Sequence, residues 1–495
     1  MLARHDIKGC TPGRRTVLLA SSLAAVLLLP EPASADALPV PLTIEQALAA
    51  ADQTNPQLLA ARARLRQVDE GVPQALSGWR PHVSVEAQGG PGIYTTNTDA
   101  KYYPERRVPQ DYELTVTQNL YTSGRVHDEV AQAKVQILAQ RAMLAGSEAE
   151  VLLTAALAFL DVVRDRDILT LNRNQEVVVA RTVTANRTEL AAGAITEADL
   201  AQSEARLARQ MAATSTARAQ LETSEAGFEA AIGLHPGVLV LPAGDLPLPV
   251  TRETALALAL QDNPALSAAR RSLEATRLGV DIARDQLLPI ISINGLVEHQ
   301  RDYEYLMYNQ RANAAQALLQ FTMPLYQGGA EYSRIRAAKE GNVQAQELVA
   351  QAERQTRRIV VAGWANLLAA RDRVQDAAAA TRADRVAEVG LGQQQAVGAR
   401  TTIDLLNAEQ ETLSSQVTEI SARHDVLAAE IALLGAAGRL DSGALLPGAT
   451  PYDPTAHYHQ VHEKWIGTTP PGNAVLAPAH SPEPGPEIDP VSHPH

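Results

Sequence analysis

The chain reads PLTIEQALAAADQTNPQLLAARARL at residues 41–65 and PVTRETALALALQDNPALSAARRSL at residues 249–273. The residues that the two stretches share, including an Asn-Pro pair, recur at a constant offset of 208. A Leu-Tyr-x-x-Gly motif, at residues 120–124 and 325–329, recurs at an offset of 205. Two copies of one long unit predict a pseudo-twofold protomer, because neither copy can bury its apolar face alone. The offset changes between residues 90 and 120, so we expect a variable loop there.

The first 35 residues are typical of a secretory signal peptide. Four basic residues precede the apolar run at residues 17–29, and Ala33-Ser34-Ala35 is a small-residue cleavage pattern. The only cysteine, Cys10, lies in this segment, so we expect neither a disulfide nor a lipid-anchoring cysteine in the mature chain. No later apolar run reaches the roughly 20 residues that a spanning helix needs. The sequence therefore predicts no transmembrane helix after the signal peptide.

Composition and motifs exclude several classes of function. The chain has 43 Lys and Arg against 56 Asp and Glu, a net charge of -13. Such a balance argues against nucleic acid and anionic bilayer surfaces as partners. The sequence contains no phosphate-binding loop, no nucleophile elbow and no zinc-binding helix motif. We therefore expect no enzyme activity, no cofactor and no bound metal.

Long helices are predicted for most of the chain. Between Ile403 and Leu434, apolar residues recur in alternating steps of three and four, which is typical of a left-handed coiled coil. Gln410 and His424 interrupt this seam, and we interpret them as polar residues that fix its register rather than as ligands. The expected helices are 43–79 with kinks at Gly71 and Pro73, 125–190, 196–232, 251–288, 331–395 and 401–437.

The helix at residues 125–190 would be on the order of 100 Å long, which is too long for an ordinary globular core. The helix that returns after Gly193 is about half as long. We expect the first helix of the copy to stack on its end and to cover the other half. Each copy would thus supply one full-length helix and one composite helix.

Four short segments are predicted to be strands. Residues 82–88 and 112–117 alternate between polar and apolar side chains, and residues 291–297 and 317–322 repeat the same phase. Nine of the chain's 12 tyrosines lie in or near these segments. The pattern is typical of a membrane β-barrel with a wet lumen, and amphipathic hairpins packed on the helices in water are the alternative. The expected strand-to-helix junctions are Pro81, Gly124, Pro289 and Gly329.

Four strands are too few to close a barrel. A single-chain outer membrane barrel has at least about 8 strands, and open strand edges cannot lie in hydrocarbon. If these strands span a bilayer, several protomers must pool them, and the attached helices must continue the same tube. The strand count alone leaves the number of protomers open.

The duplicated Asn-Pro helix, the Leu-Tyr-x-x-Gly junction and the Gly-x-x-x-x-x-Asp-Leu turn of each copy resemble the TolC-like outer membrane channel proteins, up to about Gly438. The resemblance implies a mainly α protein with a membrane β-barrel. It implies a homotrimer with four strands per protomer, a 12-stranded barrel in the outer membrane, and a long coiled-coil α-helical barrel in the periplasm.

The same resemblance implies a passive exit duct of a tripartite export system, for drug efflux or type I protein secretion. The implied partners are outer membrane lipid, a periplasmic adaptor (membrane fusion protein) and an inner-membrane transporter, either ABC-type or proton-driven. The missing lipid-anchoring cysteine favours the secretion and efflux branch, while the cargo and the particular pump are not indicated. A periplasmic coiled-coil adaptor or structural rod that never enters lipid is the alternative function.

The turns between the helices of each hairpin hold the candidate site. Thr196-x-x-Asp199 and Thr401-x-x-Asp404 each read as a helix N-cap followed three residues later by an acid. By resemblance, Asp404, Arg400 and Asp199 belong to the gate that closes the periplasmic entrance. By the same resemblance an adaptor docks on the two turns, which comprise Gly193, Ala194, Ile195 and Thr196, and Gly398, Ala399 and Thr401.

Two positions depart from the family pattern. Asn407 stands where a second gate acid can occur, and Gln395 stands where a gate tyrosine can occur. The closed entrance would therefore carry one acid per protomer at this level rather than two.

These features divide the chain into four parts. They are the signal peptide at 1–35, a first repeat at 36–240, a second repeat at 241–440, and a tail at 441–495 that we expect to be largely disordered after residue 468. The tail holds the only histidine cluster, His457, His459 and His462. We interpret it as part of a solvated periplasmic segment rather than as a metal site.

Overall fold

The computed structural model describes residues 42–98, 101–241, 247–302, 310–441, 443 and 451–471. The expected signal peptide at 1–35 and the tail beyond residue 471 lie outside the described residues. All of the described residues belong to one compact unit, which begins at Pro41.

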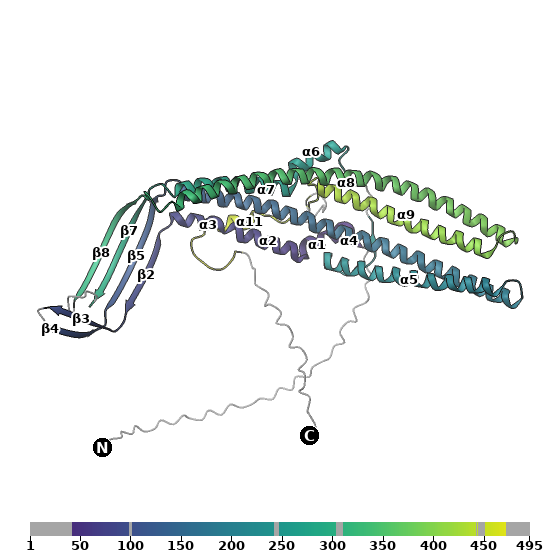
Figure 1. Cartoon of the computed structure of the whole chain (residues 1–495), viewed down its shortest axis with the longest axis horizontal. Helices are drawn as coiled ribbons and strands as arrows, with labels where there is room; N and C mark the ends of the chain where they lie inside the picture. The colour runs from purple at the N-terminus through teal and green to yellow at the C-terminus, as the bar shows by residue number, and fades with distance from the viewer. Residues whose placement is uncertain are drawn as a thin grey trace, which may run out of the picture. The chain divides into compact units, whose positions relative to one another are not determined.

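A helix pair, paired strands, a long helix and a returning helix occur in this order in each half of the chain (Figure 1). The first half contains β1 (Leu42–Thr43), α1 (Ile44–Thr54), α2 (Pro56–Asp69), α3 (Gly71–Leu76), the 3-10 helix η1 (Ser77–Trp79), β2 (His82–Gly89), β3 (Gly92–Thr98), β4 (Lys101–Arg107), β5 (Gln110–Tyr121), α4 (Arg125–Ala191) and α5 (Glu197–Ile232). The second half contains β6 (Leu239–Val240), α6 (Arg252–Asp262), α7 (Pro264–Asp285), β7 (Ile290–Arg301), β8 (Arg311–Thr322), α8 (Ala330–Ala396) and α9 (Thr402–Ala436). The short helix α11 (Ala456–Val461) follows.

The long helices lie where the sequence predicts them. Helices α4 and α8 each have 67 residues, and the returning helices α5 and α9 have 36 and 35. The long helices begin after Gly124 and Gly329, which have φ values of 99° and 86°. This left-handed conformation suits glycine and lets the chain turn sharply from strand to helix.

The prediction of one kinked helix over residues 43–79 is wrong, because the chain breaks at Asn55. Pro56 has no N–H and disfavours a helical conformation at the residue before it. Asn55 is extended, with ψ 122°, and its side-chain oxygen accepts from the backbone N–H of Gln57 at 2.9 Å. The second half breaks in the same way at Asn263, so α6 and α7 are separate helices rather than one.

The break lets the first helices cap the end of the returning helix. Asn55 Nδ2 donates to the carbonyl of Ala231 at 3.0 Å, and Thr54 Oγ1 donates to the carbonyl of Ile232 at 3.1 Å. These carbonyls at the end of α5 have no partner within their own helix. In the second half, a Cβ on Gly438 would lie 2.8 Å from the backbone carbonyl of Asp262. In each half, the residues at the Asn-Pro break thus pack against the glycine that ends the returning helix, which is Gly233 in the first half and Gly438 in the second.

The four predicted strands form one antiparallel sheet in the order β2-β5-β7-β8. Its two faces differ as the alternation predicts. Val85, Leu114 and Val297 share the apolar face, and Glu86, Glu113 and Glu298 share the polar face. Two strand pairs were not predicted. Strands β3 and β4 form an antiparallel pair within the expected variable loop, and β1 pairs in parallel with β6.

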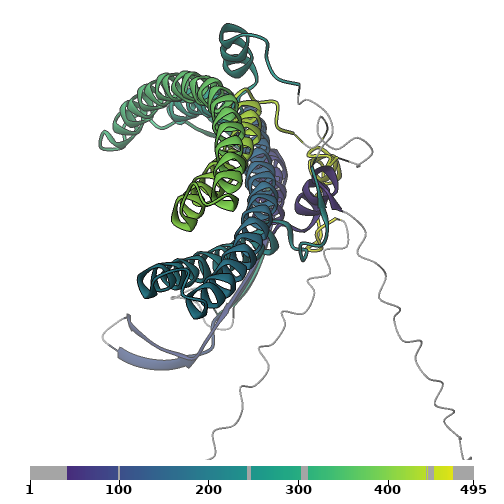
Figure 2. The same cartoon turned by 90° about the vertical axis from the view of Figure 1, so that its right-hand side faces the viewer.

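Helix α4 lies at the centre of the helical region and contacts α1, α2, α3, α5, α7 and α9. In Figure 2, α4 and α5 (blue) and α8 and α9 (green) follow one curved layer. The principal core includes Leu58 on α2, Phe159 on α4 and Phe228 on α5, all fully buried. The composite arrangement, in which α1 and α2 cover the part of α4 that α5 does not reach, agrees with the sequence-based expectation.

That no helix spans a membrane after the signal peptide stays a prediction. Among the described residues, α4 is long and apolar enough to cross a membrane by length and composition alone. The same helix supplies Leu152, Phe159 and Val162 to the core, which accounts for its apolar character.

The tail is not simply solvated. His457 Nδ1 contacts Asp69 Oδ2 at 3.0 Å, and both side chains are buried. Arg80 lies over the ring of Trp465, 4.7 Å from its centroid, and donates to the carbonyl of Lys464 at 2.8 Å. The interpretation of His457 as part of a solvated segment is therefore wrong, because its ring is buried in contact with an aspartate on α2.

Candidate functional site

The two turns at the ends of the helical hairpins have the same backbone. Gly193 and Gly398 have φ values of 73° and 75°. The N–H of the residue after each glycine donates back into the preceding helix, from Ala194 to Glu189 at 2.9 Å and from Ala399 to Gln394 at 2.8 Å. This is the Schellman type of helix end, in which glycine satisfies the last carbonyls. A Cβ on either glycine would meet nothing within 4 Å among the described residues, so both turns are open on the outside.

Each returning helix begins with a complete capping box. Asp199 Oδ2 accepts from the backbone N–H of Thr196 at 3.0 Å, and Asp404 Oδ2 accepts from that of Thr401 at 3.1 Å. In return, the threonine hydroxyls accept from the backbone N–H groups of the aspartates. The hydrogen bonds that Thr401 donates lower the pKa of Asp404, and those of Thr196 lower the pKa of Asp199. Both acids are therefore ionised and serve first as helix caps.

The two turns share a cavity of about 350 Å³. Ala194, Ile195 and Asp199 line it from the first turn, and Gly398, Arg400 and Thr401 line it from the second. Gly193, Thr196, Ala399 and Asp404 are not among its lining residues. The structure therefore brings the two predicted tips together and places Asp199 and Arg400 around one space.

Arg400 forms a hydrogen bond with the end of α8, the helix that precedes its turn. Its Nε donates to Gln394 Oε1 at 3.4 Å, and no ion pair joins it to Asp199 in the described part of the chain. Its positive charge adds a smaller contribution to the lowered pKa of Asp404.

Arg206 was not predicted, although it links the two hairpins close to the turns. From α5 its guanidinium donates to the carbonyl of Leu406 and, at 2.6 Å, to Asn407 Oδ1 on α9. The sequence could identify only Asn407 of this pair, because Asn407 departs from the family pattern. Its partner lies 201 positions away, and no local pattern identifies it.

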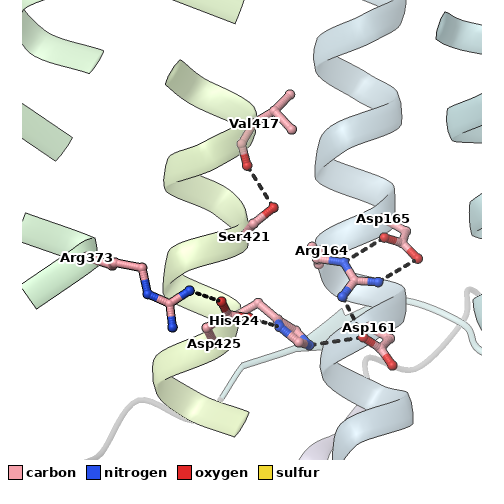
Figure 3. A network of polar contacts seen from close by, with 8 residues as sticks. All are labelled: Asp161, Arg164, Asp165, Arg373, Val417, Ser421, His424 and Asp425. Carbon is pink, nitrogen blue, oxygen red and sulfur yellow. Dashed lines mark hydrogen bonds and ion pairs between the residues drawn. The ribbon is translucent and has the colours of Figure 1, made fainter. Parts of the chain in front are cut away.

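A polar cluster joins the two halves farther along the helices (Figure 3). His424 Nε2 on α9 lies 3.0 Å from Asp161 Oδ1 on α4, and Asp161 also pairs with Arg164 at 2.8 Å. His424 Nδ1 lies 3.3 Å from Asp425, which pairs with Arg373 on α8 at 3.2 Å. The cluster therefore ties α4, α8 and α9 together at one level, as expected of a polar residue that fixes helix register.

The contact with Asp161 raises the pKa of His424, against the opposing effect of burial. Burial raises the pKa of Asp161, but the hydrogen bond with His424 and the charge of Arg164 outweigh it and lower that pKa overall. Asp165, which pairs with Arg164 at 2.8 Å, completes the charged groups around the imidazole. A histidine with a raised pKa in the folded state contributes its full stabilisation below about pH 6.5 and loses it as pH rises through the raised value.

We therefore expect His424→Gln to destabilise the protein at pH 5.5 and to have little effect at pH 9. The expected difference is about 1 kcal/mol, because the partners are partly exposed and screened. Thermal unfolding of the detergent-solubilised protein at both pH values measures it. His235→Gln is the matched control, since it removes an exposed histidine that pairs with Glu229 on the surface. An H424Q effect of the same size at both pH values would contradict the prediction.

The four junction residues lie where the strands meet the helices. Pro81 lies between η1 and β2, Gly124 precedes α4, Pro289 precedes β7 and Gly329 precedes α8. Two junctions are tied to each other, because Ser123 Oγ donates to the carbonyl of Pro289 at 2.5 Å. The sheet is thus joined to the helices through hydrogen bonds between the halves as well as through the chain.

The chain is similar to known proteins over most of its length. The family model described as outer membrane efflux protein matches residues 47–234 and, separately, 255–439. The outer membrane efflux protein BepC of Brucella suis is 31% identical over 425 residues, which cover 86% of this chain and 91% of BepC. The alkaline protease secretion protein AprF of Pseudomonas aeruginosa is 28% identical over 193 residues, which cover 38% of this chain and 39% of AprF.

Among solved structures, the outer membrane channel CmeC of Campylobacter jejuni shares the fold. Its TM-score is 0.71 at 16% identity, with 85% of this chain and 89% of that chain covered. These findings confirm the resemblance on which the sequence-based expectations depend. The chain therefore belongs to the outer membrane efflux protein family, as a channel protein of the outer membrane that extends into the periplasm and not as an enzyme.

Proposed function

We propose that this protein is the outer membrane exit duct of a tripartite export system, a passive homotrimeric channel for drug efflux or type I protein secretion. Its partners would be a periplasmic adaptor and an inner-membrane transporter. The two repeats at 36–240 and 241–440 would arise by duplication. The separate family matches at 47–234 and 255–439 support that division.

The four-stranded sheet supports the proposal most directly. Its apolar face is exposed in the single chain, with Val85, Leu319 and Phe321 at 75%, 72% and 63% exposure. Its edge strands, β2 and β8, are exposed along their whole length. In water, an exposed apolar face and two unpaired strand edges favour aggregation. In hydrocarbon, the apolar face is stable, but the unpaired backbone groups of the edges are not tolerated. Pairing β2 of one protomer with β8 of the next removes both edges. Insertion of the closed barrel into the bilayer then covers the apolar face with lipid.

Three protomers would contribute 12 strands, an even number within the range of bacterial outer membrane barrels. The polar face of each sheet would then line the lumen. The helices would continue the tube, since each strand joins a helix within a few residues.

The hairpin turns would form the periplasmic end. We propose that Asp404, Arg400 and Asp199 line the closed entrance and that the exposed turns bind the adaptor. The shared cavity and the open space outside Gly193 and Gly398 support this assignment. The adaptor-binding residues would be Gly193, Ala194, Ile195, Thr196, Gly398, Ala399 and Thr401.

Cysteine crosslinking across the proposed β2–β8 edge tests the assembly. The sequence after the predicted signal peptide contains no cysteine, so pairs introduced at Ser84 on β2 and at Ala314, Gln316 or Leu318 on β8 report only on this contact. We expect an oxidation ladder that ends at three chains and requires both cysteines. A ladder that ends at two chains would overturn the trimer. A monomer that is soluble without detergent would overturn the channel and favour a periplasmic rod.

A further inference from the structure

Carboxylates gather on the polar face of the sheet, toward the end away from the helices. Glu86 on β2, Glu113 on β5 and Glu298 on β7 lie in one register row, each directly opposite the next. Asp111 lies two positions farther along β5 on the same face. One carboxylate oxygen from each of Asp111, Glu113 and Glu298 lies within 4.8 Å of the others.

This arrangement opposes folding unless something binds the charges. Like charges directly opposite each other on neighbouring strands are destabilising. Gln88 donates to Glu86, and Gln300 donates to Glu298, so those two acids have amide partners. For Asp111, Glu113 and Glu298, the described residues provide no ion pair. Within the described part of the chain, a bound cation is thus the charge that would compensate these three carboxylates.

Asp111 is the most informative member of the cluster. It is only 8% exposed, and its Oδ1 is buried without a hydrogen-bond partner among the described residues. A buried and unpartnered carboxylate oxygen is costly, since it has lost its water and gained nothing in exchange. One oxygen of the Asp111 carboxylate lies within 4.8 Å of an oxygen of Glu113 and of an oxygen of Glu298. The Asp111 carboxylate therefore faces the cluster, where a cation could lie.

We propose that Asp111, Glu113 and Glu298 bind a divalent cation, with Ca²⁺ preferred over Mg²⁺. The donors are all carboxylate oxygens, which hard cations favour, and the neighbouring His299 lies on the opposite, apolar face. Ca²⁺ binds oxygen at about 2.3–2.6 Å in flexible geometry, so oxygens up to about 5 Å apart can share one ion. Mg²⁺ needs a tighter octahedron, which carboxylates from two separate strands satisfy poorly.

The ion would act as a clamp between the two halves of the chain. Strand β5 comes from the first half and β7 from the second, and their pairing is the only hydrogen-bonded contact between the halves within the described four-stranded sheet. A cation bridging Glu113 and Glu298 converts a repulsive pair at this seam into an attractive one. The site needs only the β5–β7 pairing, whereas its position on the lumen wall rests on the proposed barrel.

Calorimetric titration of the full-length detergent-solubilised protein with CaCl₂, after removal of metals with EDTA, tests the proposal. We expect about one Ca²⁺ per chain, with a Kd on the order of 10⁻⁴–10⁻³ M as in extracellular calcium modules, and weaker binding of MgCl₂. Glu298→Gln and Asp111→Asn should each weaken Ca²⁺ binding by at least about tenfold, because each removes one of three charged ligands. Glu86→Gln is the matched control, since it neutralises the same row outside the cluster and should preserve binding.

Thermal unfolding separates a lost site from a damaged protein. Without Ca²⁺, E298Q should unfold at or above the wild-type temperature, because a repulsive charge has been removed. With Ca²⁺, the wild type should gain stability and E298Q should not. Absence of binding by the wild type at 10 mM Ca²⁺ (about ten times the weakest Kd expected), or equal loss of binding in E86Q and E298Q, would overturn the proposal. Neither result would bear on the proposed channel, which the crosslinking tests independently.

Discussion

Replacing Arg400 and Asp404 together by alanine is expected to raise the single-channel conductance in planar lipid bilayers several-fold. Asp404 is ionised, because its hydrogen bonds with Thr401 lower its pKa. It lies in the first turn of α9, beside Arg400 in the turn itself. If the turns of three protomers meet at the entrance, these charges form a ring that restricts the pore and that neighbouring chains can latch. Alanine at both positions removes the ring and the latch together.

The gate effect must be separated from the capping effect. Asp404→Ala also removes an acceptor from the N–H of Thr401, which weakens the capping box at the start of α9. Thr401→Ala removes the hydroxyl part of the same capping box and keeps both charges, so it should leave the conductance unchanged. If R400A/D404A conducts like the wild type, the gate assignment fails while the channel stands. If T401A alone opens the channel, fraying of the helix start rather than charge controls the entrance.

Phe228→Ala is expected to lower the free energy of unfolding by about 3–5 kcal/mol, the usual range for a buried phenylalanine. The ring is fully buried, and its centroid lies 6.3 Å from that of Phe159 on α4. The pair lies in the core where α1 and α2 take over from α5 along α4. The loss would therefore weaken the composite helix at its joint.

The chain itself offers the control, because it has only three phenylalanines. Phe321 is 63% exposed on the apolar face of β8, so Phe321→Ala leaves no cavity in the helical core. Unfolding of the helices in detergent, followed by circular dichroism, should show a large decrease in the free energy of unfolding for F228A and a small decrease for F321A. Similar losses for the two variants would contradict the assignment of Phe228 to the core.

Sequence patterns were sufficient for features with a short period. The lengths of α4, α5, α8 and α9, the faces of the four strands and the capping boxes at Thr196 and Thr401 are each decided within a few residues. The absence of proline allows the long helices, and alternation with a period of two indicates the strands. A threonine followed three residues later by an acid indicates the capping boxes. The duplication strengthened these predictions, since each pattern occurs twice. The same local logic failed at Asn55, where the helical pattern on both sides concealed a break.

The sequence by itself determined where the long helices and the four strands of the sheet lie, where the helical hairpins turn, and which family the chain resembles. Only the tertiary structure decided which remote side chains meet: Asp161 with His424, Asp69 with His457, Arg206 with Asn407, and Glu113 with Glu298. The physical reason is range. Backbone conformation follows from neighbours within a few residues, whereas a contact between segments that lie hundreds of residues apart depends on the register in which whole helices and strands pack, and no local pattern records that register.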